Sequence, residues 1–120
     1  MYEIIFYKDS AGKQPVKEHL AELSRRSDKD SRINHNKIND YITLLKIHGL
    51  NLREPHIKHL DGEIWELRPI KNRVLFFGHN GNEFVLVHHF IKKTQKTPQS
   101  EIELAKKRMK DFIERGGKNE

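Results

Sequence analysis

The first half of the chain carries one short strand pattern followed by two helical stripes. Residues 2–7 are β-branched or aromatic, which predicts a strand. Pro15 is tolerated in the first turn of a helix, and the apolar residues after it recur on one helical face. A second helix is predicted from the N-cap signal Ser27-Asp28 to about His48, where Gly49 ends it.

From residue 57 onward the apolar period changes from helical spacing to two, which indicates strands. We predict strands at residues 57–60, 63–70, 73–77 and 83–91, with tight turns at Asp61-Gly62 and Asn80-Gly81. The segment 83–91 is apolar on both alternations, as expected for a central strand that is covered on both faces. The second half of the chain therefore reads as an antiparallel meander.

A last helix is predicted after the meander. Thr97-Pro98 supplies an N-cap and a first-turn proline, and Gly116-Gly117 stops the helix, so that residues 118–120 are expected to fray. The predicted order is strand, two helices, antiparallel meander and helix. Because the later strands are contiguous and do not alternate with helices, the fold class is α+β. At this length we expect one domain over residues 1–120.

The composition narrows the setting and the class of partner. The chain has 120 residues, and its 23 Lys and Arg outnumber 17 Asp and Glu, giving a net charge of +6. Such a small basic protein favours nucleic acid or an acidic protein partner. Cysteine is absent, which excludes disulfides and thiolate metal sites and is typical of the reduced cytoplasm, where we expect the protein. No apolar run approaches the length of a membrane span, so no membrane association is expected.

The meander holds the densest group of polar side chains. Alternation places Glu66 and Arg68 on one face of their strand, and Arg73 opens the next strand after a tight turn. His88 lies on the last strand, but its neighbour His89 must point to the opposite face, so the two cannot serve one site. Antiparallel pairing is expected to gather these groups with four lysines into a positive cleft: Lys58, Lys92, Lys93 and Lys96.

RNA cleavage without a metal requires such a set of groups. A base takes the proton from the ribose 2′-OH, cations stabilise the charge of the phosphorane-like transition state, and an acid protonates the leaving 5′-oxygen. Arginine suits the phosphate because its planar fork donates two parallel hydrogen bonds. The alternative is that Arg68 and Arg73 are solvated residues that discourage sheet aggregation, and that the lysines form a solvated loop. His56 and His59 are poorly placed for chelation, so no metal site is predicted.

Three stretches of the meander resemble a known group of toxins. Residues 58–68, 72–77 and 88–98 are similar to the phage-derived HigB-type branch of the RelE/ParE toxins, and the matching element order extends this over nearly the whole chain. The resemblance implies the toxin half of a bacterial type II toxin–antitoxin system. It further implies a ribosome-dependent mRNA endoribonuclease with a microbial RNase-like sheet, which is bound by a HigA-like antitoxin carrying a helix-turn-helix domain.

The resemblance also suggests roles for individual residues. Lys58, Arg68 and Arg73 match cationic positions of the RelE pattern, and Lys92 and Lys93 match its basic stretch after the last strand. We therefore assign the candidate catalytic set as Arg68, Arg73, Glu66, His88 and Lys93, and the candidate RNA-phosphate contacts as Lys58, Lys92 and Lys96, with no metal and no cofactor. The chain departs from many RelE-type toxins in having no tyrosine near its end.

Expected partners are mRNA on the ribosome and the antitoxin, with which the toxin is expected to form a hetero-oligomer. Two other functions remain open from the sequence. One is a ParE-like protein that inhibits DNA gyrase without catalysis, because that branch shares the fold. The other is a plain basic nucleic-acid-binding module, which the net charge alone allows.

Overall fold

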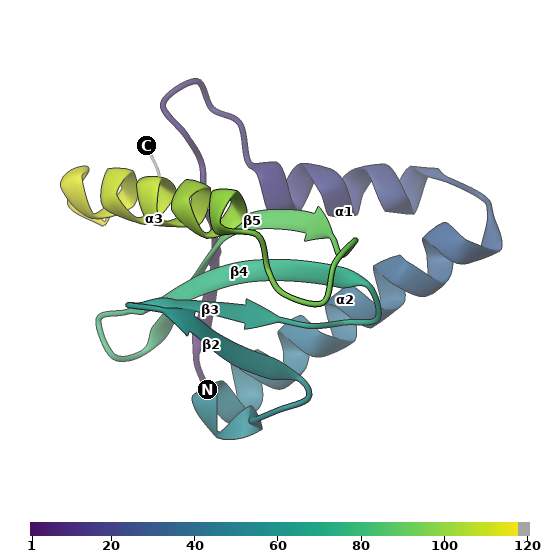
Figure 1. Ribbon diagram of the computed structural model, residues 1–120. Helices are drawn as coiled ribbons and strands as arrows, with labels where there is room; N and C mark the ends of the chain where they lie inside the picture. The colour runs from purple at the N-terminus through teal and green to yellow at the C-terminus, as the bar shows by residue number, and fades with distance from the viewer. Residues whose placement is uncertain (118–120) are drawn as a thin grey trace.

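In residues 1–117, which the computed structural model describes, five strands form one mixed sheet with helices on both faces (Figure 1). The elements in chain order are β1 (Glu3–Phe6), α1 (Pro15–Arg25), α2 (Lys29–His48), a 3₁₀ turn η1 (Gly49–Leu52), β2 (Ile57–Asp61), β3 (Ile64–Leu67), β4 (Asn72–His79), β5 (Glu83–Ile91) and α3 (Gln99–Glu114). This order confirms the α+β class. The expected fraying of residues 118–120 lies outside the described residues.

The strand order across the sheet is β1-β5-β4-β3-β2. Strands β2 to β5 pair antiparallel, which confirms the meander, while β1 runs parallel to β5 at the far edge. The β4–β5 ladder has a register shift between Leu75 and Phe76, so that Leu75 pairs with His88 whereas Phe76 pairs with Leu86. This irregularity changes which side chains of β5 share a face beyond Leu86.

Each face of the sheet has its own apolar core. Helices α1 and α2 form a V-shaped hairpin that packs on one face through residues such as Leu20, Ile38 and Leu45. Helix α3 packs on the other face through Ala105 and Phe112. None of the helices in residues 1–117 has the length and apolarity needed to cross a bilayer.

Local signals set the ends of α2 as predicted. The Asp28 side chain accepts a hydrogen bond from the Ser31 backbone N–H at 2.9 Å, and Gly49 ends the helix with φ 58°. The predicted N-cap of α3 is wrong by one residue, because Pro98 holds the cap position and its side chain makes no capping hydrogen bond. The hydroxyl of Thr97 is engaged instead by a buried carboxylate of the sheet.

The predicted strand 63–70 is shorter in the structure, since β3 stops at Leu67. Residues Pro69 to Asn72 form a tight turn, in which the Asn72 N–H donates to the Pro69 carbonyl at 2.9 Å. Ile70 has φ 60° within this turn. The turn leads directly into β4 and thereby places Arg73 next to Arg68 across the end of the sheet.

Candidate active site

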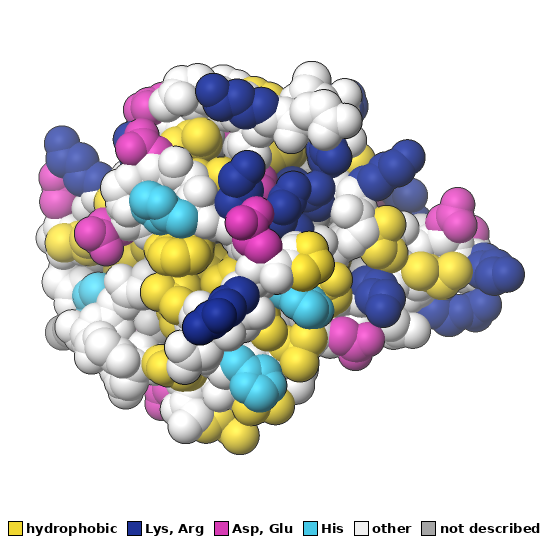
Figure 2. Space-filling view, turned by 60° about the horizontal axis from the view of Figure 1, so that its bottom comes forward, with side chains coloured by type: hydrophobic (Ala, Val, Ile, Leu, Met, Phe, Trp, Pro, Cys, Tyr) yellow, Lys and Arg dark blue, Asp and Glu magenta, His cyan; other side chains and the backbone are white. Residues whose placement is uncertain are grey.

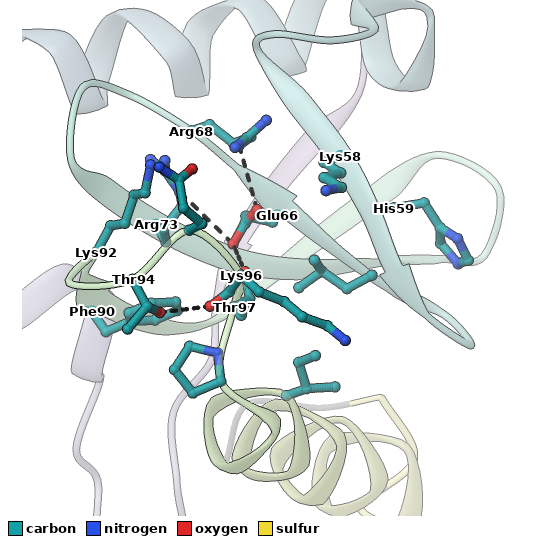
Figure 3. A pocket seen from close by; sticks show the side chains of 14 residues that line it. Lys58, His59, Glu66, Arg68, Arg73, Phe90, Lys92, Thr94, Lys96 and Thr97 are labelled. Carbon is teal, nitrogen blue, oxygen red and sulfur yellow. Dashed lines mark hydrogen bonds and ion pairs between the residues drawn. The ribbon is translucent and has the colours of Figure 1, made fainter.

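A pocket of about 120 Å³ lies at this end of the sheet, on the face that α3 covers (Figure 3). Strands β2, β3 and β4 form its floor, and the loop between β5 and α3 forms one wall. It is lined by Lys58, His59, Leu60, Glu66, Arg68, Arg73, Phe90, Lys92, Thr94, Gln95, Lys96, Thr97, Pro98 and Ile102.

Glu66 lies at the centre of this pocket and is 1% exposed (Figure 3). It follows Ile64 by two positions on β3, and this alternation turns both side chains toward α3. One carboxylate oxygen accepts a 2.5 Å hydrogen bond from the Thr97 hydroxyl. The same oxygen is 3.8 Å from Arg73 Nε, and the other is 3.4 Å from Arg68 Nε. The carboxylate is thus held between two guanidinium groups.

The guanidinium of Arg73 is fixed by backbone as well as by charge. The residue is 5% exposed, and its Nη1 donates to the carbonyls of Ile70 at 3.1 Å and of Asn72 at 2.8 Å. Burial lowers the pKa of Arg73, and the neighbouring Glu66 carboxylate works against that shift. The guanidinium of Arg73 stays protonated in spite of this shift, because arginine is not deprotonated in proteins.

Arg68 lies nearer to the solvent than Arg73. Its side chain is 23% exposed, and its Nη1 is 3.8 Å from a Glu54 carboxylate oxygen. The Nε of Arg68 is buried and makes no well-aligned hydrogen bond within the described residues, although it faces Glu66. Both arginines therefore converge on one buried carboxylate from adjacent strand ends.

Three lysines complete the charge of the pocket. Lys58 on β2 pairs in register with Glu66, and Lys92 and Lys96 come from the loop after β5. Together with the two arginines they give five cations around one carboxylate. A cleft lined by one sign of charge concentrates counter-ions, and here it favours the binding of phosphate.

Figure 2 shows further Lys and Arg side chains on the projecting α1–α2 hairpin, where Arg25, Arg26, Lys29 and Arg32 are exposed.

Two of the residues predicted to be catalytic lie outside this pocket. His88 faces α3, where its Nδ1 accepts from Arg108 Nη1 at 3.3 Å and its Nε2 contacts Glu101 at 2.9 Å. Burial, which is the largest influence, lowers the pKa of His88. Lys93 lines a neighbouring hollow together with Glu101, so only Lys92 of the two adjacent lysines lines the pocket.

His89 points to the opposite face of the sheet from His88, as alternation predicted. Its ring stacks on His19 of α1 with centroids 3.6 Å apart, and its Nε2 contacts Asn72 at 3.1 Å. Burial lowers the pKa of His89 to about 3, so its imidazole is neutral at pH 7. Neither histidine of the pair therefore serves the pocket.

The sequence reasoning missed Thr97 and His59 as pocket residues. The sequence predicts only a helix cap at Thr97, and no periodic pattern in its irregular loop indicates that it contacts a strand residue 31 positions earlier. For His59 the sequence raises only the question of metal chelation, whereas the residue lines the pocket with its Nε2 2.8 Å from the Gly62 carbonyl. The signal available for His59 was its place in the sequence directly after Lys58, which is assigned to the cleft.

The donors in the pocket suit an anion better than a metal ion. In residues 1–117, no three His, Asp or Glu side chains lie close enough together to hold a metal. The single carboxylate is already paired with guanidinium groups, whose charge repels a cation. The arrangement can bind a phosphate diester and stabilise negative charge that develops on it.

A family model described as "Phage derived protein Gp49-like (DUF891)" matches residues 19–110. This span covers more than half of the chain and contains all the residues that line the pocket. No curated protein matches the chain. The description agrees with the phage-derived origin that the sequence resemblance indicated, and it names neither the HigB branch nor an activity.

Proposed function

Because the chain belongs to the phage-derived Gp49-like family, we propose that it is the toxin of a bacterial type II toxin–antitoxin system. In this proposal it acts as a metal-independent, ribosome-dependent mRNA endoribonuclease of the HigB type. The observation that carries the proposal is the pocket, in which five cations surround one buried carboxylate. The similarity of residues 58–68, 72–77 and 88–98 to HigB-type toxins supports the same conclusion.

Burying charge is costly, and this cost makes the pocket informative. Desolvation of an ion pair commonly exceeds or cancels the attraction within it, so buried charged clusters contribute little net stability. Glu66 and Arg73 are nonetheless almost fully buried beside a pocket that opens to solvent. Burial lowers the pKa of Arg73, and a buried ionisable group with a shifted pKa beside a cleft is typical of functional sites.

The proposed chemistry assigns different tasks to the pocket residues. Arg68 and Arg73 hold the scissile phosphate and stabilise the charge that builds up as the 2′-oxygen bonds to phosphorus and the bond to the 5′-oxygen breaks. Glu66 orients the two guanidinium groups, to which it is 3.4 and 3.8 Å distant. The 2′-OH proton and the proton for the leaving oxygen are exchanged with the groups of the pocket that can carry one, namely Glu66, His59 and the three lysines.

The proposal is tested by single-turnover cleavage of mRNA on programmed ribosomes. We expect Arg68→Ala and Arg73→Ala to slow cleavage by ~10²–10³-fold, because each removes a donor directed at transition-state charge. Lys107→Ala and Lys110→Ala are the charge-matched controls on the exposed side of α3. Removing either lysine is expected to lower the affinity for the mRNA-programmed ribosome, and the salt dependence of this binding, only slightly. Circular dichroism is used to check that each of the four variants is folded.

Two outcomes contradict the proposal. If both arginine variants cleave at the wild-type rate, the reaction does not take place in this pocket. If the wild-type protein cuts no mRNA but inhibits DNA supercoiling in a parallel assay, a ParE-like gyrase inhibitor is the better description.

The proposal includes a protein partner. We propose that a helix-turn-helix antitoxin binds the toxin and neutralises it by covering or distorting the basic pocket. The net charge of +6 favours an acidic antitoxin segment, so the affinity is expected to fall as ionic strength rises. An affinity that does not depend on salt would contradict the electrostatic part of this proposal.

A further inference from the structure

Asn72, which directly precedes Arg73, has a buried side chain in the middle of a chain of hydrogen bonds. The residue is 4% exposed. Its Nδ2 donates to Asn34 Oδ1 on α2 at 2.7 Å and to the Pro69 carbonyl at 3.2 Å. Its Oδ1 lies 3.1 Å from His89 Nε2 on β5. The amide thus connects a helix, a turn and a strand.

The donor and acceptor of each hydrogen bond in this series follow from the groups at its two ends. Asn34 donates its own Nδ2 to the Asp30 carbonyl at 2.8 Å, which leaves its Oδ1 as an acceptor for Asn72. The Oδ1 of Asn72 must then accept from His89, so the neutral imidazole of His89 carries its proton on Nε2. The ring of His89 is seated against His19 of α1, with centroids 3.6 Å apart.

The turn that Asn72 closes contains a strained residue. Ile70 has φ 60°, a conformation that is rare for any residue with a side chain and exceptional for a β-branched one. Strain of this kind persists only where the surrounding contacts hold it. Asn72 supplies two of those contacts, since its backbone N–H and its Nδ2 both donate to the Pro69 carbonyl, at 2.9 and 3.2 Å.

The same turn holds the guanidinium group of Arg73. The carbonyl oxygens of Ile70 and Asn72 both accept from Arg73 Nη1, at 3.1 and 2.8 Å. Two acceptors on one nitrogen fix the plane of the guanidinium more firmly than the looser 3.8 Å contact between its Nε and Glu66. The turn conformation therefore sets the direction in which Arg73 presents its donors to the pocket.

We propose that Asn72, braced by Asn34 and His89, is a positioning residue that holds the strained turn so that its carbonyls fix the Arg73 guanidinium in the pocket. The conformational part of this proposal concerns the free protein. The catalytic consequence rests on the proposed function, in which Arg73 binds the scissile phosphate.

The first measurement needs no RNA. In ¹⁵N NMR spectra of arginine side chains, the Nη1 protons of Arg73 are expected to exchange slowly in the wild type and at least tenfold faster in Asn72→Ala. The matched control is Tyr7→Phe, which removes a 2.6 Å hydrogen bond to Asp111 at a distance from the pocket and should leave the Arg73 signals unchanged. Unchanged Arg73 signals in Asn72→Ala would overturn the proposal.

A second variant covers the case in which Asn72→Ala does not fold. Glycine adopts positive φ without strain. Combining Asn72→Ala with Ile70→Gly therefore removes the backbone strain that the hydrogen bonds of Asn72 hold in the wild type. In the double variant we expect slow exchange at Arg73 to return in part. The double variant can also fold while the Nη1 protons of Arg73 exchange as fast as in an unfolded chain. In that case Asn72 does not act by holding Ile70 in its strained conformation, and the proposal fails.

The catalytic consequence is measured by single-turnover cleavage at varied ribosome concentration. Asn72→Ala is expected to lower the maximal rate by about 10–100-fold with little change in the half-saturating concentration, because misplacing a catalytic group by about 1 Å can cost ~10². Adding Ile70→Gly should raise the rate again, and Tyr7→Phe should not lower it. If Asn72→Ala and Tyr7→Phe lower the maximal rate equally, or if Asn72→Ala changes only the half-saturating ribosome concentration, Asn72 does not position Arg73. If the wild type cleaves no mRNA, the proposed function fails, and the NMR result alone decides whether Asn72 positions Arg73.

Discussion

Replacing Glu66 by glutamine tests whether the pocket is built around a buried carboxylate charge. The change keeps the shape of the side chain and an oxygen that can accept the hydrogen bond from Thr97. It removes the negative charge that stands 3.8 Å from Arg73 Nε and 3.4 Å from Arg68 Nε. Arg73, whose side chain is 7% exposed, is then left buried without an opposite charge.

The expected loss of stability can be estimated from these distances. At an effective dielectric constant near 20, unit charges about 4 Å apart attract by about 4 kcal/mol. Removing one partner of a buried ion pair typically costs about 3–5 kcal/mol. We take the lower end, because the side chain of Arg68 is 23% exposed and water can solvate it in the variant. The expected change in the free energy of unfolding is therefore about 3 kcal/mol.

Urea denaturation followed by circular dichroism measures this change. With a slope of about 1.5 kcal/mol per molar urea, the midpoint should fall by about 2 M. The matched control is Glu103→Gln on α3, whose side chain is 58% exposed and whose Oε1 is 3.9 Å from Lys106 Nζ. This exposed pair is expected to contribute less than about 0.5 kcal/mol.

A double-mutant cycle separates the ion pair from other effects of the substitution. Arg73→Met should destabilise the wild type by clearly more than it destabilises Glu66→Gln, because the partner charge is already absent in the variant. The reasoning is refuted if Glu66→Gln costs less than about 1 kcal/mol and the cycle shows no coupling. The negative charge of Glu66 would then not be what holds the two guanidinium groups in the pocket.

Three further predictions concern stability elsewhere in the fold. Burial lowers the pKa of His89 from 6.5 to about 3, so between these pH values the unfolded state binds more protons than the folded state. The free energy of unfolding should therefore be highest above about pH 7 and should fall by up to about 1.4 kcal/mol per pH unit as the pH drops below 6. Urea titrations at pH 7 and pH 5 should show this loss in the wild type and much less of it in His89→Gln. Tyr7→Phe removes the 2.6 Å hydrogen bond to the Asp111 carboxylate and should cost about 1.5 kcal/mol in thermal unfolding, and an unchanged melting temperature would show that this bond is not formed. Gly49→Ala should cost about 2 kcal/mol, because Gly49 has φ 58° and ψ −143° and an added Cβ would lie 2.6 Å from the Tyr2 ring; a variant as stable as the wild type would mean that α2 ends differently.

Elements whose signals are local could be predicted from the sequence. The ends of α2 follow from a capping side chain at Asp28 and a positive φ at Gly49, both of which depend on neighbouring residues alone. The β4–β5 hairpin follows from Asn80-Gly81, whose φ values are 56° and 78°. The parallel pairing of β1 with β5 could not be predicted in the same way, because it joins segments about 80 residues apart and nothing in the pattern of β1 identifies its neighbour.

In the candidate site, too, residues with local sequence signals could be predicted, and residues placed by tertiary packing could not. Glu66, Arg68 and Arg73 could be grouped from alternation and from the short turn between their strands, and the structure places all three in one pocket. His88 shares the α3 face of the sheet with the pocket but lies outside it, and its contacts with Glu101 and Arg108 on α3 depend on tertiary packing that the sequence pattern does not show. Thr97 was missed for the same reason, because its contact with Glu66 arises only when the loop after β5 folds over the sheet.

Two costly features lie within a few residues of each other at this end of the sheet. One is the group of buried charges around Glu66, and the other is the positive φ of Ile70. An apolar cluster of similar volume would often be equally or more stable than the buried charges, and glycine would relieve the strain at position 70. Both features act on Arg73, since Glu66 faces its Nε and the Ile70 carbonyl accepts from its Nη1. Under the proposed function, these two costly features hold the guanidinium of Arg73 in place before any ligand binds, as transition-state stabilisation by a preorganised cation requires.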